Sequence, residues 1–346
     1  MTRFIHTADL QIGKPYRQIT DEQKRFKLRQ ERLNVIDRIA DVIKLQKPEF
    51  LLIAGDLFDS PIPSKAVVME VMELIGRMGL PVFVIPGNHD HGALGTFWHG
   101  DHFKKYSKLM APNLCVLLDS EPVELENSII FPCPLLRNKD NIDSTIWLRN
   151  YNWSETPSSK VRIILAHGGV HEFGGSSYSF DDEVSPSSGN LIDLEALPVK
   201  EIDYIALGDW HNLKQVGSKA WYSGTPEPDR FDQGENNHRG QVLLVDISRG
   251  QIPTVTSIPT GRLKWHNIRF KFNSDSDLDR FERTVDDLTS GRVARDLLRV
   301  EISGGLSFAA YARFELLKRD LENKLLRLRI KGECYQFPET AEIDEL

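Results

Sequence analysis

Five short polar clusters in this sequence each follow directly on an apolar run. They are Asp9-Leu10-Gln11, Gly55-Asp56-Leu57-Phe58-Asp59, Gly87-Asn88-His89-Asp90, His167-Gly168-Gly169 and Gly208-Asp209-Trp210-His211. If the apolar runs are neighbouring strands, their ends bring these side chains together. Converging carboxylates, imidazoles and an amide require cations, and such mixed sets suit Mn²⁺, Fe or Zn²⁺. The pattern predicts a dinuclear metal centre, whose two ions would clamp a phosphate and activate a bridging water for phosphoester hydrolysis.

The elements that must position these clusters alternate between strands and helices. Residues 3–8, 50–54 and 82–86 are predicted to be buried strands, each ending where a polar cluster begins. A helix is predicted between the first two, because apolar residues recur three or four apart and Pro48 follows them. These apolar positions are Leu33, Ile36, Ala40 and Ile43. The alternation indicates an α/β fold.

Six later apolar runs extend the pattern, at residues 114–118, 128–131, 161–166, 202–207, 241–245 and 254–258. Together with the first three, they suffice for two stacked sheets. Residues 168–190 are rich in Gly, Ser and Asp and lack periodicity, which predicts a long loop able to act as a lid.

A change of pattern near Thr260 predicts two domains, residues 1–260 and a smaller α/β domain of residues 261–346. The second part reads as a strand at 265–272, a helix at 276–288, a strand at 297–302 and a helix at 307–328. Residues 313–331 carry seven basic and three acidic side chains, interpreted as a solvated face rather than a nucleic-acid groove.

The composition of the 346 residues is that of a folded globular protein, with 40% hydrophobic and 27% charged residues. The net charge of −7 falls on residues 1–260, since residues 261–346 hold 16 basic and 16 acidic side chains. This negative charge disfavours binding of a polyanion such as DNA, unless bound cations or a partner protein offset the charge. No apolar run approaches the ~20 residues of a membrane span and no signal peptide opens the chain, so we expect a cytoplasmic protein. Cys115, Cys133 and Cys334 are expected to be buried thiols.

The ordered clusters resemble the calcineurin-like metallophosphoesterases, whose motifs run D-x-H, G-D-x-x-D, G-N-H-[DE], H and G-H-x-H. Within that family the sequence is most similar to the Mre11/SbcD nuclease branch. The segments that carry this likeness are His6-Thr7-Ala8-Asp9, Gly55-Asp56-Leu57-Phe58-Asp59-Ser60, Ala206-Leu207-Gly208 and Tyr222-Ser223-Gly224-Thr225-Pro226. The resemblance implies a four-layer α/β/β/α metallophosphoesterase sandwich, with residues 261–346 as a small C-terminal α/β capping and partner-binding domain.

The resemblance also implies two divalent ions and a set of site residues. One metal ion would be held by Asp9, Gln11, Asp56 and His211, and the other by Asp56, Asn88, His167 and Asp209. In this interpretation Asp56 bridges the two ions. His89 would stabilise the transition state or protonate the leaving oxygen, and Asp59 is the nearest motif residue able to orient it.

Two positions depart from the family pattern. Gln11 stands where His is usual, and Asp209 replaces the first His of G-H-x-H. Both changes move the ligand set from nitrogen toward oxygen, which favours Mn²⁺ or Mg²⁺ over Zn²⁺. Gln at this position also occurs in manganese-dependent diphosphatases of the superfamily, so it is compatible with catalysis.

The resemblance implies a hydrolase of DNA repair, an exonuclease or endonuclease subunit that binds DNA. It also implies a Rad50/SbcC-type ATPase partner and a homodimer. The chain itself has no P-loop and no G-x-S-x-G motif, so neither ATP binding by that loop nor serine hydrolysis is expected. Two alternatives stay open: a phosphatase or nucleotide diphosphatase acting on a small molecule, and a catalytically degenerate scaffold subunit.

Overall fold

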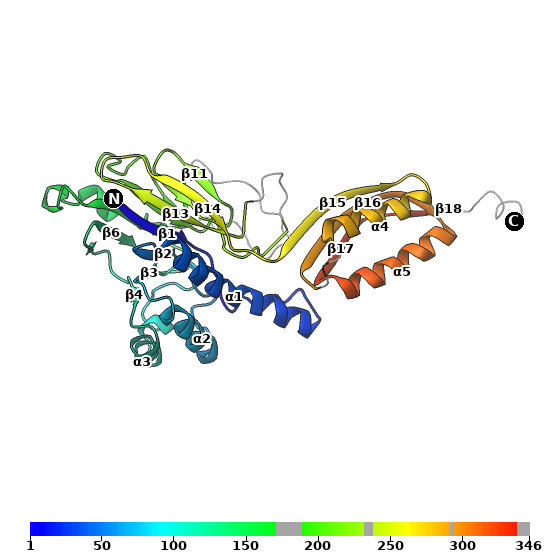
Figure 1. Cartoon of the computed structure of the whole chain (residues 1–346), viewed down its shortest axis with the longest axis horizontal. Coiled ribbons are helices and arrows are strands. Elements are labelled where there is room, and N and C mark those ends of the chain that lie inside the picture. The colour runs from blue at the N-terminus through cyan, green and yellow to red at the C-terminus, as the bar shows by residue number, and fades with distance from the viewer. Residues whose placement is uncertain (171–188, 232–237, 291, 293, 338–346) are drawn as a thin grey trace, which may run out of the picture. The chain divides into compact units, whose positions relative to one another are not determined.

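The computed structural model of the chain describes residues 1–170, 189–231, 238–290, 292 and 294–337 (Figure 1). The chain divides into two compact units. The N-terminal unit comprises Met1–Tyr16, Leu28–Glu227 and His238–Gly261. The C-terminal unit comprises Arg17–Lys27, Pro228–Asn237 and Arg262–Leu346. All five polar clusters belong to the N-terminal unit.

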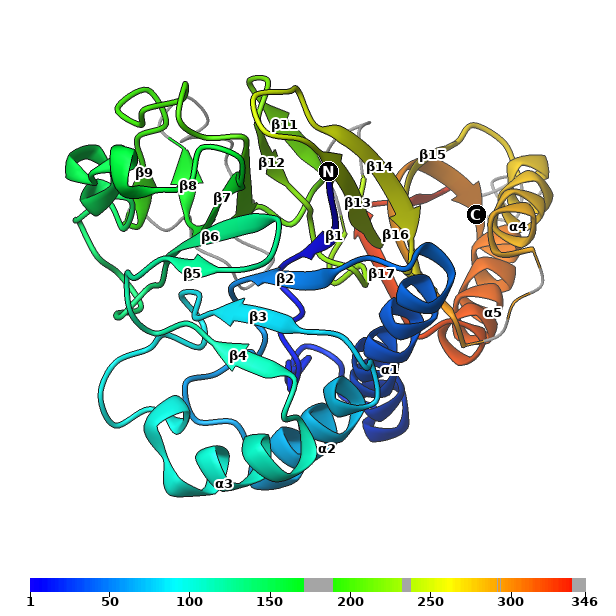
Figure 2. The same cartoon turned by 60° about the vertical axis from the view of Figure 1, so that its left-hand side comes forward.

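The first sheet of the N-terminal unit has the strand order β14-β13-β1-β2-β3-β4 (Figure 2). Strands β1 to β4 run parallel, and β13 and β14 add antiparallel neighbours beyond β1. The strands are β1 (Thr2–Thr7), β2 (Phe50–Ala54), β3 (Val82–Ile85), β4 (Leu114–Val116), β13 (Gln241–Ile247) and β14 (Thr254–Pro259). Because β1, β2 and β3 are parallel, the clusters that follow them emerge at one edge of the sheet.

The second sheet has the order β11-β12-β10-β7-β6-β5. Its four inner strands are parallel and its two outer strands are antiparallel to their neighbours. The strands are β5 (Val123–Glu124), β6 (Ser128–Cys133), β7 (Val161–His167), β10 (Tyr204–Gly208), β11 (Lys214–Val216) and β12 (Ala220–Tyr222). The clusters that begin at His167 and Gly208 therefore lie at the ends of adjacent strands.

Alternate side chains of the first sheet enter two different cores. Ile5 and Leu51 pack with apolar residues of the helices α1 (Glu22–Gln46), α2 (Lys65–Gly76) and α3 (Asp101–Met110). Phe4 and Phe50 stack on each other at 5.2 Å and face the second sheet, where Ile163 belongs to the same cluster. The period of two in the strands thus buries both faces of this sheet.

The outer face of the second sheet is covered by short elements. Phe131 packs against Tyr151 and Trp153, with ring centroids 5.3 and 4.9 Å away. These aromatic residues belong to the segment of the 3₁₀ turns η2 (Ile146–Asn150) and η3 (Trp153–Glu155). Directly after β7, the strand β8 (Gly169–Val170) pairs in parallel with β9 (Leu191–Ile192). The predicted α/β class with two stacked sheets is confirmed.

Helix α1 ends just before Pro48, as the sequence predicts. The helix ends at Gln46, and Lys47 adopts a left-handed backbone with φ of 50° immediately before Pro48. A proline disfavours helical geometry in the residue before it, which ends the helix there.

The C-terminal unit is a small sheet backed by two helices. Strands β15, β16 and β17 run parallel, and β18 pairs with the far end of β16. Its core includes Phe272, Phe281, Val300 and Phe314. The elements are β15 (Lys264–Phe272), α4 (Ser276–Thr289), β16 (Asp296–Ser307), α5 (Phe308–Lys324), β17 (Arg327–Gly332) and β18 (Tyr335–Phe337).

The helix expected at residues 307–328 is too long. Helix α5 ends at Lys324, and Leu328 lies in strand β17. Basic and apolar residues alternate in Arg327–Gly332, and this period of two is the pattern of a strand. The apolar positions of the strand happened to continue the helical spacing, which explains the error.

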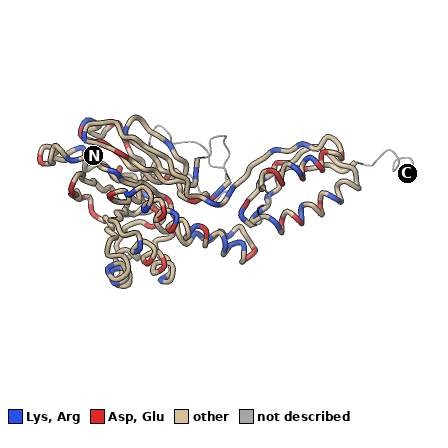
Figure 3. Tube along the Cα trace, viewed as in Figure 1, with Lys and Arg blue, Asp and Glu red and all other residues tan. Residues whose placement is uncertain are grey.

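Several sequence expectations concern the whole chain. The proposed lid at residues 168–190 falls mostly outside the described residues. In the described part, no helix is both long and apolar enough to cross a membrane. Cys133 is buried as expected, whereas Cys115 is exposed and Cys334 is only half-buried. Lys, Arg, Asp and Glu are interspersed along the traces of both units (Figure 3).

Candidate metal centre

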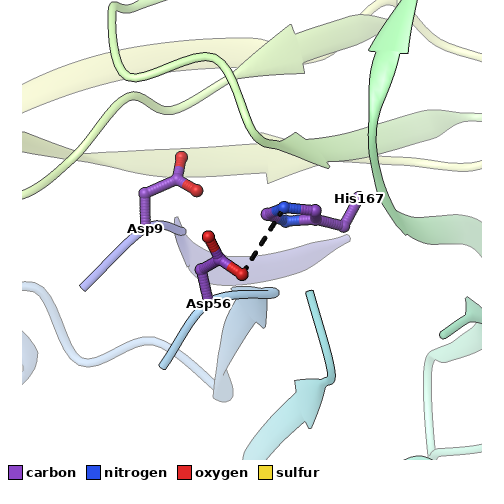
Figure 4. A group of neighbouring side chains, drawn as sticks. All are labelled: Asp9, Asp56 and His167. Carbon is purple, nitrogen blue, oxygen red and sulfur yellow. Dashed lines mark ion pairs between the residues drawn. The ribbon is translucent and has the colours of Figure 1, made fainter. Parts of the chain in front are cut away.

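Three buried side chains from both sheets meet at the strand ends. Asp9 follows β1, Asp56 follows β2, and His167 is the last residue of β7. One potential ligand atom of each residue lies within 4.8 Å of those of the other two, and all three residues are buried. Figure 4 shows the Asp56 carboxylate beside the His167 ring, with 3.7 Å between Oδ1 and Nε2. These three residues form a group that could hold a metal ion.

The backbone at this centre is strained. Four of its residues that are not glycine have a left-handed backbone, with φ of 55° at Asp9, 44° at Gln11, 54° at Asp56 and 96° at Asp209. Each such conformation costs roughly 1–3 kcal/mol and persists only where the surroundings enforce it. Concentration of this strain in one cluster is typical of a functional site.

Glycines allow the strand ends to approach closely. A Cβ atom on Gly55 would lie 2.2 Å from His167 Nδ1, and one on Gly87 would lie 2.2 Å from Asp56 Oδ1. A Cβ atom on Gly208 would lie 1.9 Å from the carbonyl oxygen of Ala54. The glycines of three clusters therefore provide the space into which the site side chains fit.

Asp56 accepts hydrogen bonds from two other clusters. The backbone N–H of His89 donates to its Oδ1 at 2.9 Å, and Gln11 Nε2 donates to its Oδ2 at 3.1 Å. Burial alone would raise the pKa of Asp56, but the nearby His167 and His89, together with these hydrogen bonds, lower it below its usual value. Asp56 is thus held as a carboxylate at the centre of the group.

His167 is fixed by hydrogen bonds at both ring nitrogens. Its Nδ1–H donates to the carbonyl of Ala54 at 2.8 Å, and Nε2 lies 2.8 Å from Asn88 Oδ1. Burial would lower its pKa, but Asp56, Asp9 and Asp209 raise the pKa to about 9. A backbone carbonyl on Nδ1 leaves Nε2 directed at the carboxylates, which is the arrangement of a metal-ligating histidine.

Asp9 and Asp209 are joined through the backbone of Asp209, whose N–H is 3.2 Å from Asp9 Oδ1. Burial and the neighbouring charges of Asp56 and Asp209 raise the pKa of Asp9 to about 8, against the opposing effect of His167. Asp209 Oδ1 lies 3.9 Å from His167 Nε2. A cation would relieve the repulsion among these carboxylates, so the donor set fits a divalent metal ion.

Gln11 contacts the centre with its amide nitrogen. Its Nε2 lies 3.4 Å from His211 Nε2, and its Oε1 accepts a hydrogen bond from Lys14 Nζ at 3.0 Å. The amide oxygen is the atom of Gln11 that can ligate a cation. Lys14 therefore competes with a metal ion for this oxygen.

His89 lies beside the acidic group and keeps a solvent-accessible face, with 30% of its side chain exposed. Its Nε2 is 4.0 Å from Asp56 Oδ2, and its Nδ1 is 3.6 Å from Asp59 Oδ1. Burial raises the pKa of Asp59. Asp59, which was expected to orient His89, is therefore adjacent to the imidazole ring.

Asp90 is a buried residue of the centre that the sequence places in a polar cluster without indicating a role for it. Its carboxylate accepts the backbone N–H of Gly87 at 2.8 Å and that of Phe58 at 3.0 Å. Burial and the nearby charge of Asp56 raise its pKa to about 7. Asp90 joins the loops after β2 and β3, and its place directly after His89 in a motif was the available signal.

Comparison with known proteins agrees with this geometry. The model of the calcineurin-like phosphoesterase family matches residues 2–213, which is more than half of the chain. The chain belongs to the calcineurin-like phosphoesterase family, and it is a phosphoester hydrolase of the class that uses divalent metal ions.

Three curated relatives are nucleases or repair proteins by name. The chain is 22% identical to the SbcD component of the nuclease SbcCD from Staphylococcus epidermidis, over 76% of this chain and 70% of that protein. It is 24% identical to the SbcD component of the same nuclease from Bacillus subtilis, over 73% and 68% of the two chains. It is 26% identical to the DNA double-strand break repair protein Mre11 of Methanosarcina acetivorans, over 95% of this chain but only 51% of that protein.

Proposed function

We propose that the chain is a metal-dependent DNA phosphodiesterase, the nuclease subunit of an Mre11/SbcD-like complex. The observation that carries the proposal is the buried group of Asp9, Asp56 and His167, with His89 and Asp59 beside it. Two of the three relatives are nucleases by name, and the name of the third gives DNA double-strand break repair, which together support DNA as the substrate. Residues 1–260 would form the nuclease domain, and residues 261–346 the capping and partner-binding domain.

Seven residues would hold two divalent ions on this proposal. One set is Asp9, Gln11, Asp56 and His211, and the other is Asp56, Asn88, His167 and Asp209. Two such ions, when bound, would polarise the phosphate and activate a water as the nucleophile. The abundance of oxygen donors favours Mn²⁺, with Mg²⁺ compatible and Zn²⁺ less suited.

His89 would act on the substrate directly. Its exposed face and its distance from Asp59 suit a group that donates a proton or a hydrogen bond to the scissile phosphate. Asp59 would fix the ring through Nδ1 and leave Nε2 for the substrate. His89 would therefore hold a proton at its Nε2, beside the acidic group.

The test is cleavage of end-labelled linear duplex DNA by the purified chain in Mn²⁺. We expect Asp56→Ala to lose cleavage, because it removes the central carboxylate. Asp246→Asn is the matched control, since Asp246 pairs with Arg3 on strand β1 rather than with a cluster residue. Cleavage that survived in Asp56→Ala would refute the proposed mechanism.

A second candidate is a phosphatase or nucleotide diphosphatase that acts on a small molecule. The net charge of −7 on residues 1–260 and the presence of Gln11 in the first motif favour it. Nucleotide diphosphates assayed beside DNA separate the two. Turnover of the diphosphates alone would favour the second candidate.

The partners are also part of the proposal. Two of the relatives are named as one component of a larger nuclease, which supports an SMC-like ATPase of the Rad50/SbcC type. The proposal also includes a homodimer of this chain. Light scattering on the purified chain measures the oligomer, and addition of a purified ATPase of that type should increase DNA cleavage.

A further inference from the structure

Arg32 is a buried cation that reaches the backbone of the metal loop. It lies on helix α1 and is only 1% exposed. Its Nη2 donates to the carbonyl of Asp9 at 2.8 Å, and its Nε donates to the carbonyl of Gln11 at 3.2 Å. We propose that Arg32 and Thr225 form a clamp that positions the metal-facing side chains of Asp9 and Gln11. The inference rests on the proposed metal centre.

The two carbonyl groups in question belong to strained residues. Asp9 and Gln11 both have a left-handed backbone, which is unfavourable for residues with a side chain. Their N–H groups are bonded to the next loop, Asp9 to the carbonyl of Gly55 at 3.2 Å and Gln11 to that of Asp56 at 2.8 Å. Arg32 fixes the opposite side of these residues. Its two contacts therefore hold a conformation that the residues would not adopt alone.

Thr225 gives the clamp its second part. Its hydroxyl accepts a hydrogen bond from Arg32 Nη2 at 3.2 Å and lies 2.9 Å from the carbonyl of Asp9. Its backbone N–H donates to the carbonyl of His211 at 3.0 Å. Thr225 thus connects the loop of Asp9 with the loop of His211, which come from different sheets.

The segment around Thr225 is shaped for this contact. Gly224 has φ of 71°, and a Cβ atom there would lie 2.8 Å from the carbonyl oxygen of His211. Arg32 Nη1 also donates to the carbonyl of Glu227 at 3.1 Å. The Tyr222-Ser223-Gly224-Thr225-Pro226 segment, which the catalytic assignment leaves without a role, would serve to anchor the two ligand-bearing loops.

Arginine is specifically suited to this position. The guanidinium group is planar and remains charged, and its several N–H donors reach separate carbonyls in a fixed geometry. A lysine has one ammonium group at the end of a flexible chain, so it cannot span the carbonyls of Asp9 and Gln11 in the same way. The Arg32→Lys variant therefore tests geometry while it keeps the charge.

The experiment measures Mn²⁺ binding to the full chain by titration calorimetry, with thermal unfolding followed on the same samples. Groups that orient metal ligands typically contribute 10–100-fold to metal affinity, so we expect Arg32→Lys to lose at least about tenfold. Thr225→Val keeps the volume and removes the hydroxyl, and should weaken binding in the same direction. Arg32→Ala should regain part of its affinity in methylguanidinium.

Arg162→Lys is the matched control for a buried arginine. The Arg162 side chain is 4% exposed, and its Nη2 donates to the carbonyls of Trp153 and Thr156 at 3.2 Å each. It contacts no residue of the metal loops in these bonds. We expect Arg162→Lys to lower the melting temperature while its Mn²⁺ affinity stays at the wild-type value.

The outcomes distinguish the clamp from the metal centre. Wild-type affinity in folded Arg32→Lys and Thr225→Val would overturn the clamp and leave the metal centre intact. An equal loss of affinity in Arg162→Lys would also overturn it, because general destabilisation would then explain the result. Absence of Mn²⁺ binding by the wild-type chain would overturn the metal centre, and the clamp with it.

Discussion

His89 and Asp59 are neighbours at the edge of the acidic group, with 3.6 Å between Nδ1 and Oδ1. The backbone carbonyl of Asp59 lies 3.4 Å from the same nitrogen. The imidazole is thus held on one side by a residue of the β2 loop, although it belongs to the loop after β3. The other ring nitrogen faces the carboxylate of Asp56.

This arrangement predicts separate effects on turnover and metal binding. We expect His89→Gln to lower kcat about 10²–10⁴-fold, the usual range for loss of a general acid or base. Its Mn²⁺ affinity should change little, because the ring stands beside the proposed ligands. Asp59→Asn should have a smaller effect in the same direction, since the ring keeps its backbone contact. Steady-state kinetics and calorimetry check these values.

The control for this pair is His102→Gln, which alters an exposed histidine beside Lys65. We expect it to behave as the wild type. Unchanged turnover in His89→Gln would remove His89 from the mechanism.

Replacing Gln11 by histidine should strengthen metal binding. The amide oxygen of Gln11 accepts from Lys14, whereas an imidazole would offer a nitrogen ligand to the centre. We expect Gln11→His to bind Zn²⁺ about tenfold more tightly than the wild type, the size of a typical change around a metal site. Competition titration with a chelating dye measures this. Gln215→His, at an exposed position of β11, controls for binding by an added surface histidine; equal gains in both variants would count against the assignment.

The sequence was informative about the centre because each cluster directly follows a strand. Asp9 and Asp56 could be predicted to meet, since β1 and β2 are parallel neighbours with their ends at one edge. His167 ends a strand of the second sheet, and its place beside them followed from the family resemblance. Arg32 could not be predicted, because one arginine in an amphipathic helix has the pattern of a solvated face. Its role depends on two carbonyl groups more than 20 positions away in the sequence.

Backbone conformation was the other feature beyond reach. The sequence shows glycines in the clusters, but it does not show that Asp9 and Asp56 adopt a left-handed backbone, which is uncommon outside glycine. The boundary between α5 and β17 was also predicted wrongly. Leu328 fits a helical spacing and a strand alternation equally well, and only the pairing with β16 decides between them.

The glycine before Asp56 should be indispensable. Gly55 has φ of 88°, and a Cβ atom would lie 2.2 Å from His167 Nδ1. We expect Gly55→Ala to lower the free energy of unfolding by about 3 kcal/mol or more, from strain and overpacking together, and to abolish tight Mn²⁺ binding. Gly79→Ala is the matched control, because Gly79 has φ of 70° with no atom within 4 Å. It should lose only about 1–2 kcal/mol and retain metal binding. Urea unfolding and calorimetry on both variants decide, and similar losses in the two would show that strain alone accounts for the effect.

His6 should make the free energy of unfolding depend on pH. The residue is fully buried on β1, with Nδ1 3.1 Å from the hydroxyl of Tyr204, and burial lowers its pKa to about 3. The unfolded chain binds a proton at His6 below about pH 6.5, whereas the folded chain does so only near pH 3. The unfolded state therefore gains a proton first as the pH falls, and the free energy of unfolding falls by about 1.4 kcal/mol per pH unit across this window.

Urea unfolding in a chelator between pH 7 and 4 measures this dependence of the free energy of unfolding on pH. The additional slope due to His6 should be present in the wild type and in His102→Gln, and absent in His6→Gln. Equal slopes in the wild type and His6→Gln would mean that His6 is protonated in the folded chain at the same pH as in the unfolded one.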